Sequence, residues 1–207
     1  MATYGVKPND RGPRWVHIVK DEIMRSETKK KLVIFLLLTA ALSAVFHVLI
    51  ARTGTLRGGG RRLVAGLMWS PGVAAIVTQL VTEGELRGLG WRWGKTRYQL
   101  LSIAVPLLLI ATVYGAVVAA GLGGFPNAVF VDEIRSQINL DVAPWEAILI
   151  YAGVSATFGL ATSSLTALGE EIGWRGLLAP ELARLTGFTR AALISGVIWS
   201  IYHYPVM

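Results

Sequence analysis

Long uncharged apolar runs, separated by short polar clusters, make up most of the chain. A membrane-spanning helix needs about 20 mostly apolar residues, because an unpaired backbone polar group in the hydrocarbon core costs several kcal/mol. The runs of this length are 32–51, 63–82, 98–122, 145–168 and 190–207. None of the runs alternates apolar and polar residues with the period of two typical of a β-barrel strand. The pattern predicts an all-α, polytopic transmembrane helical bundle with about five spans.

The residues before the first apolar run are polar and mixed in charge, and they end in Lys29, Lys30 and Lys31. The run that follows has full span length, and no small-residue cleavage site follows it, so we expect a retained helix and not a signal peptide. No internal repeat is evident. We therefore expect residues 1–31 to form a cytoplasmic basic N-terminal segment and residues 32–207 to form one transmembrane domain.

Basic residues predict how the chain crosses the membrane, because Lys and Arg in short flanks resist translocation. The N-terminus is rich in them and is expected in the cytoplasm of a multi-pass cell-membrane protein. Alternation then places 83–97 and 169–189 inside, and 123–144, which carries Asp132, Glu133 and Asp141, outside as a loop. Arginines at positions 52, 57, 61 and 62 do not fit this alternation, which leaves open whether the first two runs form a simple hairpin.

Composition excludes several classes of function. The chain is 53% hydrophobic and 16% charged, too apolar for an ordinary soluble domain, so the lipid bilayer is its expected partner. It has no cysteine, which excludes disulfides, thiolate metal sites and thiol nucleophiles. The basic segment 83–97 contains Trp91 and Trp93 and is expected to contact anionic lipid, not nucleic acid. No HExxH sequence is present, and we expect neither a metal nor another cofactor.

The most unusual polar group lies directly after the fourth apolar run, where residues 166–178 read TALGEEIGWRGLL. On a helix, Glu171 and Arg175 are one turn apart and can form an ion pair, whereas Glu170 points about 100° away. A carboxylate left unpaired beside a membrane span suits general-base activation of water. The alternative is that these charges only cap a membrane helix at the cytoplasmic interface, where charge costs little.

A histidine in the last apolar run strengthens the first interpretation. His203 lies in VIWSIYHYP, one turn after Trp199. If the helix carrying Glu170 turns at residues 186–187, Glu170 and His203 are equally far from the turn, and they can share one cavity. Pro180 is expected to kink or break the first of these helices. The alternative for His203 is a buried histidine bonded to a neighbouring backbone carbonyl.

These residues resemble the intramembrane glutamic endopeptidases of the CAAX-protease and bacteriocin-processing (CPBP) family. That family carries EExxxR, which matches Glu170, Glu171 and Arg175, and later an aromatic-xxx-His element, which matches Trp199 and His203, although the family's usual aromatic is Phe. The resemblance implies peptide-bond hydrolysis at the membrane, with Glu170 activating water, His203 helping to form the site, and Arg175 and Glu171 holding its geometry. The substrates it implies are membrane-associated peptides or prenylated proteins with CAAX-type C-termini.

The sequence leaves two alternatives to an active protease. Family members carry a second histidine and an asparagine in later spans, whereas this sequence has neither after His203, so we expect a C-terminally incomplete domain or a shortened homologue. A shortened homologue would have a non-catalytic binding role, such as bacteriocin immunity. A transporter fragment, in which Glu170 and His203 line a proton path, is the other alternative, although no inverted repeat supports it. The sequence predicts no oligomeric state.

Overall fold

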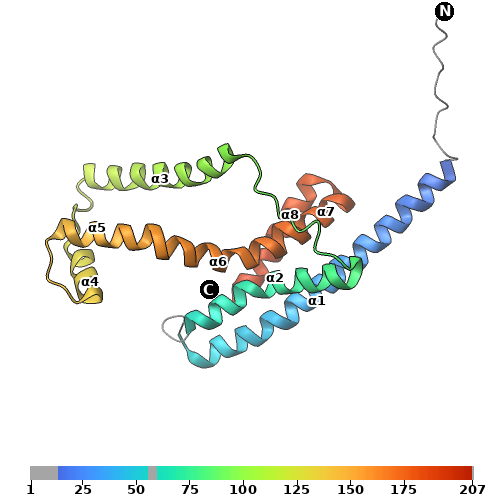
Figure 1. Ribbon diagram of the computed structural model, residues 1–207, viewed down its shortest axis with the longest axis horizontal. Coiled ribbons are helices and arrows are strands. Elements are labelled where there is room, and N and C mark those ends of the chain that lie inside the picture. Colours follow the sequence, from blue (N-terminus) through green and yellow to red (C-terminus); the bar gives the residue numbers. More distant parts are fainter. Residues whose placement is uncertain (1–13, 56–59, 207) are drawn as a thin grey trace, which may run out of the picture. The chain divides into compact units, whose positions relative to one another are not determined.

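The computed structural model describes residues 14–55 and 60–206, and regular secondary structure within these ranges is entirely helical (Figure 1). The α-helices are α1 (Arg14–Thr53), α2 (Gly60–Glu83), α3 (Thr96–Ala119), α4 (Ala128–Ile138), α5 (Pro144–Val154), α6 (Leu160–Glu171), α7 (Ala179–Thr186) and α8 (Phe188–His203). The π-helical stretches η1 (Ser155–Gly159) and η2 (Ile172–Leu178) join α5 to α6 and α6 to α7, and a 3-10 turn, η3 (Tyr204–Val206), follows α8. The predicted all-α class is confirmed.

Four helical stretches in the described part of the chain are long and apolar enough to cross a membrane: Trp15–Thr53, Gly60–Glu83, Thr96–Ala119 and Pro144–Thr186. Helix α3 gives the clearest evidence for a membrane environment, because its side chains are mostly apolar and yet none of its residues is buried within the protein. A helix that is apolar all round needs lipid or protein around it. Helix α8, the expected fifth span, has only 16 residues and is about 24 Å long, shorter than the ~30 Å hydrocarbon core. The chain is a helical integral membrane protein.

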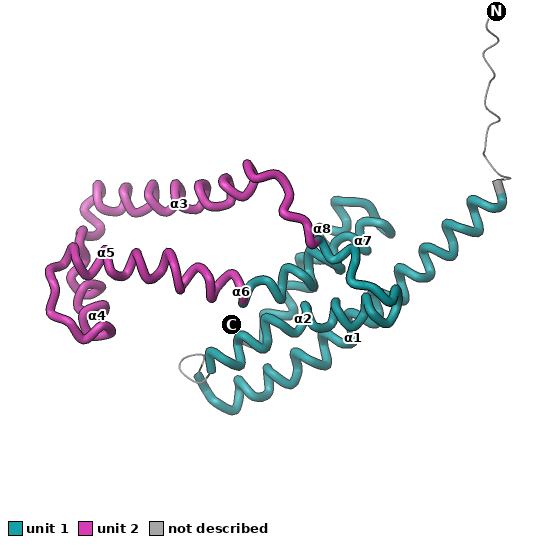
Figure 2. The backbone as a smooth tube through the Cα atoms, viewed as in Figure 1, with its two compact units in different colours: residues 1–90, 166–207 teal, residues 91–165 magenta. Residues whose placement is uncertain are grey.

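The chain divides into two compact units (Figure 2). The first contains Met1–Gly90 and Thr166–Met207, and the second contains Trp91–Leu165. The predicted site residues all belong to the first unit.

In the first unit, α1 and α2 lie side by side as an antiparallel hairpin (Figure 1), which answers the question left open by the arginines between them. The two helices approach closely at Gly66, where an added Cβ would lie 2.3 Å from the Phe46 ring. Arg57, in the connection, lies outside the described residues. Helix α1 runs without interruption across residue 31, so the division into 1–31 and 32–207 stays a prediction.

Glycines also allow α2 to contact the end of α6 and the start of η2. A Cβ added to Gly169 would lie 2.7 Å from the Trp69 Cα, and one added to Gly72 would lie 2.6 Å from the Gly169 carbonyl oxygen. One added to Gly173 would lie 2.5 Å from the Pro71 Cβ. Small residues let membrane helices pack backbone against backbone in this way. We call Gly72, Gly169 and Gly173 the glycine contact.

The segment around Pro180 stays helical. Pro180 has no N–H to donate within a helix and was expected to kink or break it, yet Pro144–Thr186 is one helical stretch. Pro180 lies in the first turn of α7, directly after the π-helical turns of η2, and the wider turns change the hydrogen-bond register there. As predicted, the chain turns at Gly187, whose φ is +80°, and α8 begins at Phe188.

In the second unit, the expected external loop contains a helix. Asn127 caps α4 by accepting a hydrogen bond from the Phe130 backbone N–H at 3.0 Å. Val131 and Ile134, three residues apart, are buried against Ala147 of α5. This three-residue spacing of apolar side chains is typical of an amphipathic helix, and the acidic residues between them obscured it.

A buried lysine connects three helices of the first unit. The Lys31 side chain of α1 is 7% exposed and pairs with Glu83 of α2 and with Glu181 of α7, whose Oε1 lies 3.2 Å from Nζ. The Arg184 Nη1 lies 2.9 Å from the same Glu181 oxygen, and Gln79 donates to Glu83 Oε2 at 2.7 Å. We call these five side chains the Lys31 network. The charges of Lys31 and Arg184 balance those of Glu83 and Glu181.

We expect Lys31→Met to lower the free energy of unfolding by about 1–3 kcal/mol, because the buried Glu181 loses its ammonium partner and keeps only the exposed Arg184. Thermal unfolding in detergent, followed by circular dichroism, measures the effect. The exposed neighbour Lys30 provides the control, and Lys30→Met should leave the midpoint nearly unchanged. Equal midpoints for the two variants would contradict a stabilising role for the Lys31 network.

The glycine contact gives a second stability prediction. Gly173→Ala should destabilise the protein by about 1–3 kcal/mol, because the new methyl group meets the Pro71 backbone and ring. Gly153→Ala in α5 is the matched control, since a Cβ there meets no atom within 4 Å, and it should be neutral or stabilising. The same unfolding assay compares them, and a neutral Gly173→Ala would show that the backbones can separate freely.

Candidate active site

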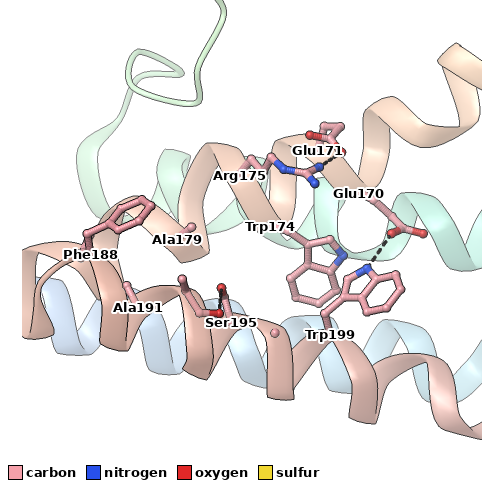
Figure 3. Close-up of a pocket in the computed structure, with 12 residues that line it drawn as sticks. Glu170, Glu171, Trp174, Arg175, Ala179, Phe188, Ala191, Ser195 and Trp199 are labelled. Carbon is pink, nitrogen blue, oxygen red and sulfur yellow. Dashed lines mark hydrogen bonds and ion pairs between the residues drawn. The ribbon is translucent and has the colours of Figure 1, made fainter. Parts of the chain in front are cut away.

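Three of the four predicted site residues, Glu170, Glu171 and Arg175, line one cleft in the first unit, and the fourth, His203, lies next to Glu170. The cleft has a volume of about 640 Å³ and lies between the segment α6–η2–α7 and helix α8 (Figure 3). Its lining residues are Glu170, Glu171, Trp174, Arg175, Ala179, Ala183, Phe188, Ala191, Ala192, Ser195, Gly196 and Trp199. Apart from the two glutamates and Arg175, the lining is small, apolar or aromatic. The cleft is therefore a mostly apolar groove with its charged groups on α6 and η2.

Glu170 is the more enclosed of the two glutamates, with a side chain only 12% exposed. Trp199 of α8 donates its indole N–H to Glu170 Oε2 at 3.3 Å (Figure 3). The His203 Nε2 lies 3.6 Å from Glu170 Oε1. The structure thus brings Glu170 and His203 together from two helices, as their equal distance from the turn at Gly187 predicted.

His203 also bonds to the backbone. Its Nδ1 lies 2.9 Å from the Trp199 carbonyl oxygen, and because a carbonyl oxygen only accepts, Nδ1 carries the hydrogen. In the neutral ring, Nε2 then presents a lone pair to Glu170. The Trp199 and His203 rings lie 4.1 Å apart between centroids, which restricts the imidazole further. The sequence allowed His203 either to share a cavity with Glu170 or to bond to a neighbouring backbone carbonyl, and the structure contains both contacts.

Glu171 and Arg175 form the expected ion pair along the helix. Their side chains are 47% and 73% exposed, far more than that of Glu170, and Figure 3 shows them apart from the Glu170–Trp199 contact. The two adjacent carboxylates therefore have different partners. One is neutralised by a guanidinium, and the other is bonded to an indole and faces an imidazole.

Two aromatic residues that were not among the predicted site residues support this arrangement. Trp174 packs edge-on against Phe35, with centroids 5.9 Å apart, and against Tyr202, with centroids 5.1 Å apart. Tyr202 donates its hydroxyl to the Leu67 carbonyl oxygen, which ties α8 to α2. Their only signal in the sequence is their position next to Arg175 and His203.

The described part of the chain contains no group of three or more His, Cys, Asp or Glu side chains arranged to hold a metal ion. The chemistry that the site offers is that of a carboxylate, an imidazole and indole N–H donors beside an apolar groove. These groups can accept and donate protons and can donate hydrogen bonds to an uncharged polar ligand.

Residues 152–207 match the family described as "Rce1-like: Type II CAAX prenyl endopeptidase Rce1-like". The matched segment contains the EExxxR sequence, Trp199 and His203. No curated protein and no solved structure matches the chain. The resemblance to the CPBP family is confirmed, and at the family level the match supports a CAAX-type intramembrane protease. The roles of the individual site residues stay predictions.

Proposed function

From the Rce1-like, type II CAAX prenyl endopeptidase character of residues 152–207, we propose that this membrane protein hydrolyses a peptide bond with a water molecule activated by Glu170. The observation that carries the proposal is the approach of Glu170 Oε1 to His203 Nε2, at 3.6 Å, beside an apolar cleft. Neither group is engaged by Arg175, which pairs with Glu171.

The spacing of these two atoms suits a bound water. The Glu170 oxygen and the neutral His203 Nε2 are both acceptors, so a water about 2.8 Å from each can donate one hydrogen to each. The Trp199 N–H holds the other carboxylate oxygen and so restricts rotation of the Glu170 side chain. The water is thereby oriented before the reaction begins.

The proposed reaction is simple hydrolysis. Glu170 takes a proton from the water as the water oxygen bonds to the peptide carbonyl carbon, and the carbonyl π electrons move onto the carbonyl oxygen. When the resulting oxyanion collapses, the C–N bond breaks, and the amine leaves with the proton that Glu170 returns. The products are one carboxylic acid and one amine, and the enzyme is regenerated.

The proposed substrate is a membrane-associated peptide or a prenylated protein with a CAAX-type end. Support comes from the wall of the cleft, where Ala179, Ala183, Ala191, Ala192 and Gly196 offer an apolar surface of small residues. We assign Glu171 and Arg175 a positioning role, because their ion pair keeps a second carboxylate from competing for the water.

We also propose a cell-membrane location with the N-terminus in the cytoplasm, on the distribution of Lys and Arg. The cysteine-free sequence makes this directly testable, because any introduced cysteine is unique. Ser136→Cys in α4 should react with a membrane-impermeant maleimide in intact cells. Lys95→Cys, before α3, should react only after permeabilisation, and the reverse pattern would contradict the orientation.

Glu170→Gln should lower kcat for cleavage of a prenylated CAAX-type peptide by about 10²–10⁴-fold, because the amide cannot take a proton from water. Mass spectrometry of the peptide products, with protein in micelles or vesicles, measures the loss. Glu133→Gln, an exposed carboxylate in α4, is the matched control and should retain activity. Membrane insertion and the unfolding midpoint should be the same for both variants.

Undiminished cleavage by Glu170→Gln would overturn the proposed mechanism. If the unmodified chain binds the peptide but cleaves none, the result would favour the non-catalytic binding role.

A further inference from the structure

The cleft contains an N–H group that the proposed mechanism does not use. Trp174 lines the cleft and is only 7% exposed, and its indole nitrogen, Nε1, is buried with no hydrogen-bond partner among the described residues. A buried donor without an acceptor is unfavourable, and native proteins leave few of them. This donor therefore calls for a functional explanation.

The direction of this N–H is fixed by packing. The Trp174 ring is held edge-on by Phe35 from α1 and by Tyr202 from α8. Its backbone follows Gly173, which touches Pro71 of α2. A donor held from three helices is preorganised, as a group that stabilises developing charge must be.

The donor also lies beside the proposed water-activating carboxylate. Trp174 is four residues after Glu170, which places both side chains on neighbouring turns, and both line the cleft. Figure 3 shows the indole nitrogen of Trp174 turned toward Trp199 and Glu170. The acceptor that this position suits is one brought next to Glu170 by a ligand.

We propose that the Trp174 Nε1–H donates a hydrogen bond to the carbonyl oxygen of the scissile peptide bond and to the oxyanion formed when water adds to it. The inference rests on the proposed function, in which Glu170 activates that water. A carbonyl oxygen is the matching ligand chemistry, because it only accepts and gains negative charge during the addition.

Access to the Trp174 nitrogen requires a local movement, since the atom is shielded from solvent in this structure. The adjacent Trp199 ring is the side chain of the cleft that we expect to shift. It is 42% exposed, and its bond to Glu170, at 3.3 Å, is longer than a typical N–H···O bond. A small shift of this ring lets the entering carbonyl reach the Trp174 N–H while the Trp199 N–H stays bonded to Glu170 Oε2.

Two variants remove the donor while keeping an aromatic ring: Trp174→Phe, and replacement of Trp174 by 3-benzothienylalanine, in which sulfur replaces the N–H in a ring of nearly the same shape. Each should lower kcat for a prenylated CAAX-type peptide by about 10²–10³-fold with little change in KM. Trp145→Phe, outside the cleft, is the matched control and should retain full activity. If the benzothienyl variant retains full kcat, the proposal is wrong, whatever Trp174→Phe does.

A binding measurement separates this inference from the proposed catalytic role of Glu170. In ¹⁵N-tryptophan-labelled Glu170→Gln protein, the Trp174 indole signal is identified by its absence from the Trp174→Phe spectrum. Adding the peptide should move that indole proton downfield and leave the Trp145 signal in place. A saturating peptide that leaves the Trp174 signal unmoved would overturn the inference even if Glu170 proves essential. A downfield shift would support the donor role even if Glu170→Gln still cleaves.

Discussion

Backbone contact between α2 and the α6–η2 segment is the constraint on which the site depends. At Gly169 and Gly173 the backbone lies so close to α2 that an added Cβ would overlap atoms of that helix. Each of these glycines is followed directly by a residue that lines the cleft: Glu170 follows Gly169, and Trp174 follows Gly173. Because the backbone just before each of these side chains is fixed against another helix, both point in defined directions. In a bilayer, where helix association depends on close packing, such contacts also supply much of the attraction between helices.

The site also requires that α8, after the turn at Gly187, place His203 at the same level along the helices as Glu170. The turn at Gly187 lies sixteen residues before His203 and seventeen after Glu170 in the sequence, so the two residues meet although π-helical turns and Pro180 intervene. Tyr202 then bonds to Leu67 of α2, which holds α8 against the same helix that the glycine contact uses. The carboxylate and the imidazole are therefore positioned against a common support, which keeps their separation short.

Local features of this site were predictable from the sequence, and features that depend on distant residues were not. Four of the five expected spans, the turn at Gly187 and the Glu171–Arg175 pair depend on hydropathy or on one helical turn, and each is present, whereas α8 is too short to be the fifth span. The burial of Lys31 depends on Glu83 and Glu181, 52 and 150 residues away, and a lysine in a basic flank gives no sign of it. The same limit hid Trp174, whose ring is held by residues of α1 and α8.

Charge pairing explains why Glu170 differs from the other acidic residues of the C-terminal segment. That segment has three, at 170, 171 and 181, and the last two pair with cations that stay charged, Glu171 with Arg175 and Glu181 with Lys31 and Arg184. Glu170 instead faces His203, and Arg175 pairs with Glu171 and not with Glu170. The cations occupy carboxylate oxygens of Glu171 and Glu181, whereas Glu170 Oε2 is bonded to an uncharged indole and Glu170 Oε1 faces an imidazole 3.6 Å away, a spacing that admits a water between them. A charged group near an apolar span is costly, so it is usually paired or has a function. Among the described residues, Glu170 has no Lys or Arg partner comparable to those of Glu171 and Glu181, so it is the carboxylate best suited to activate water.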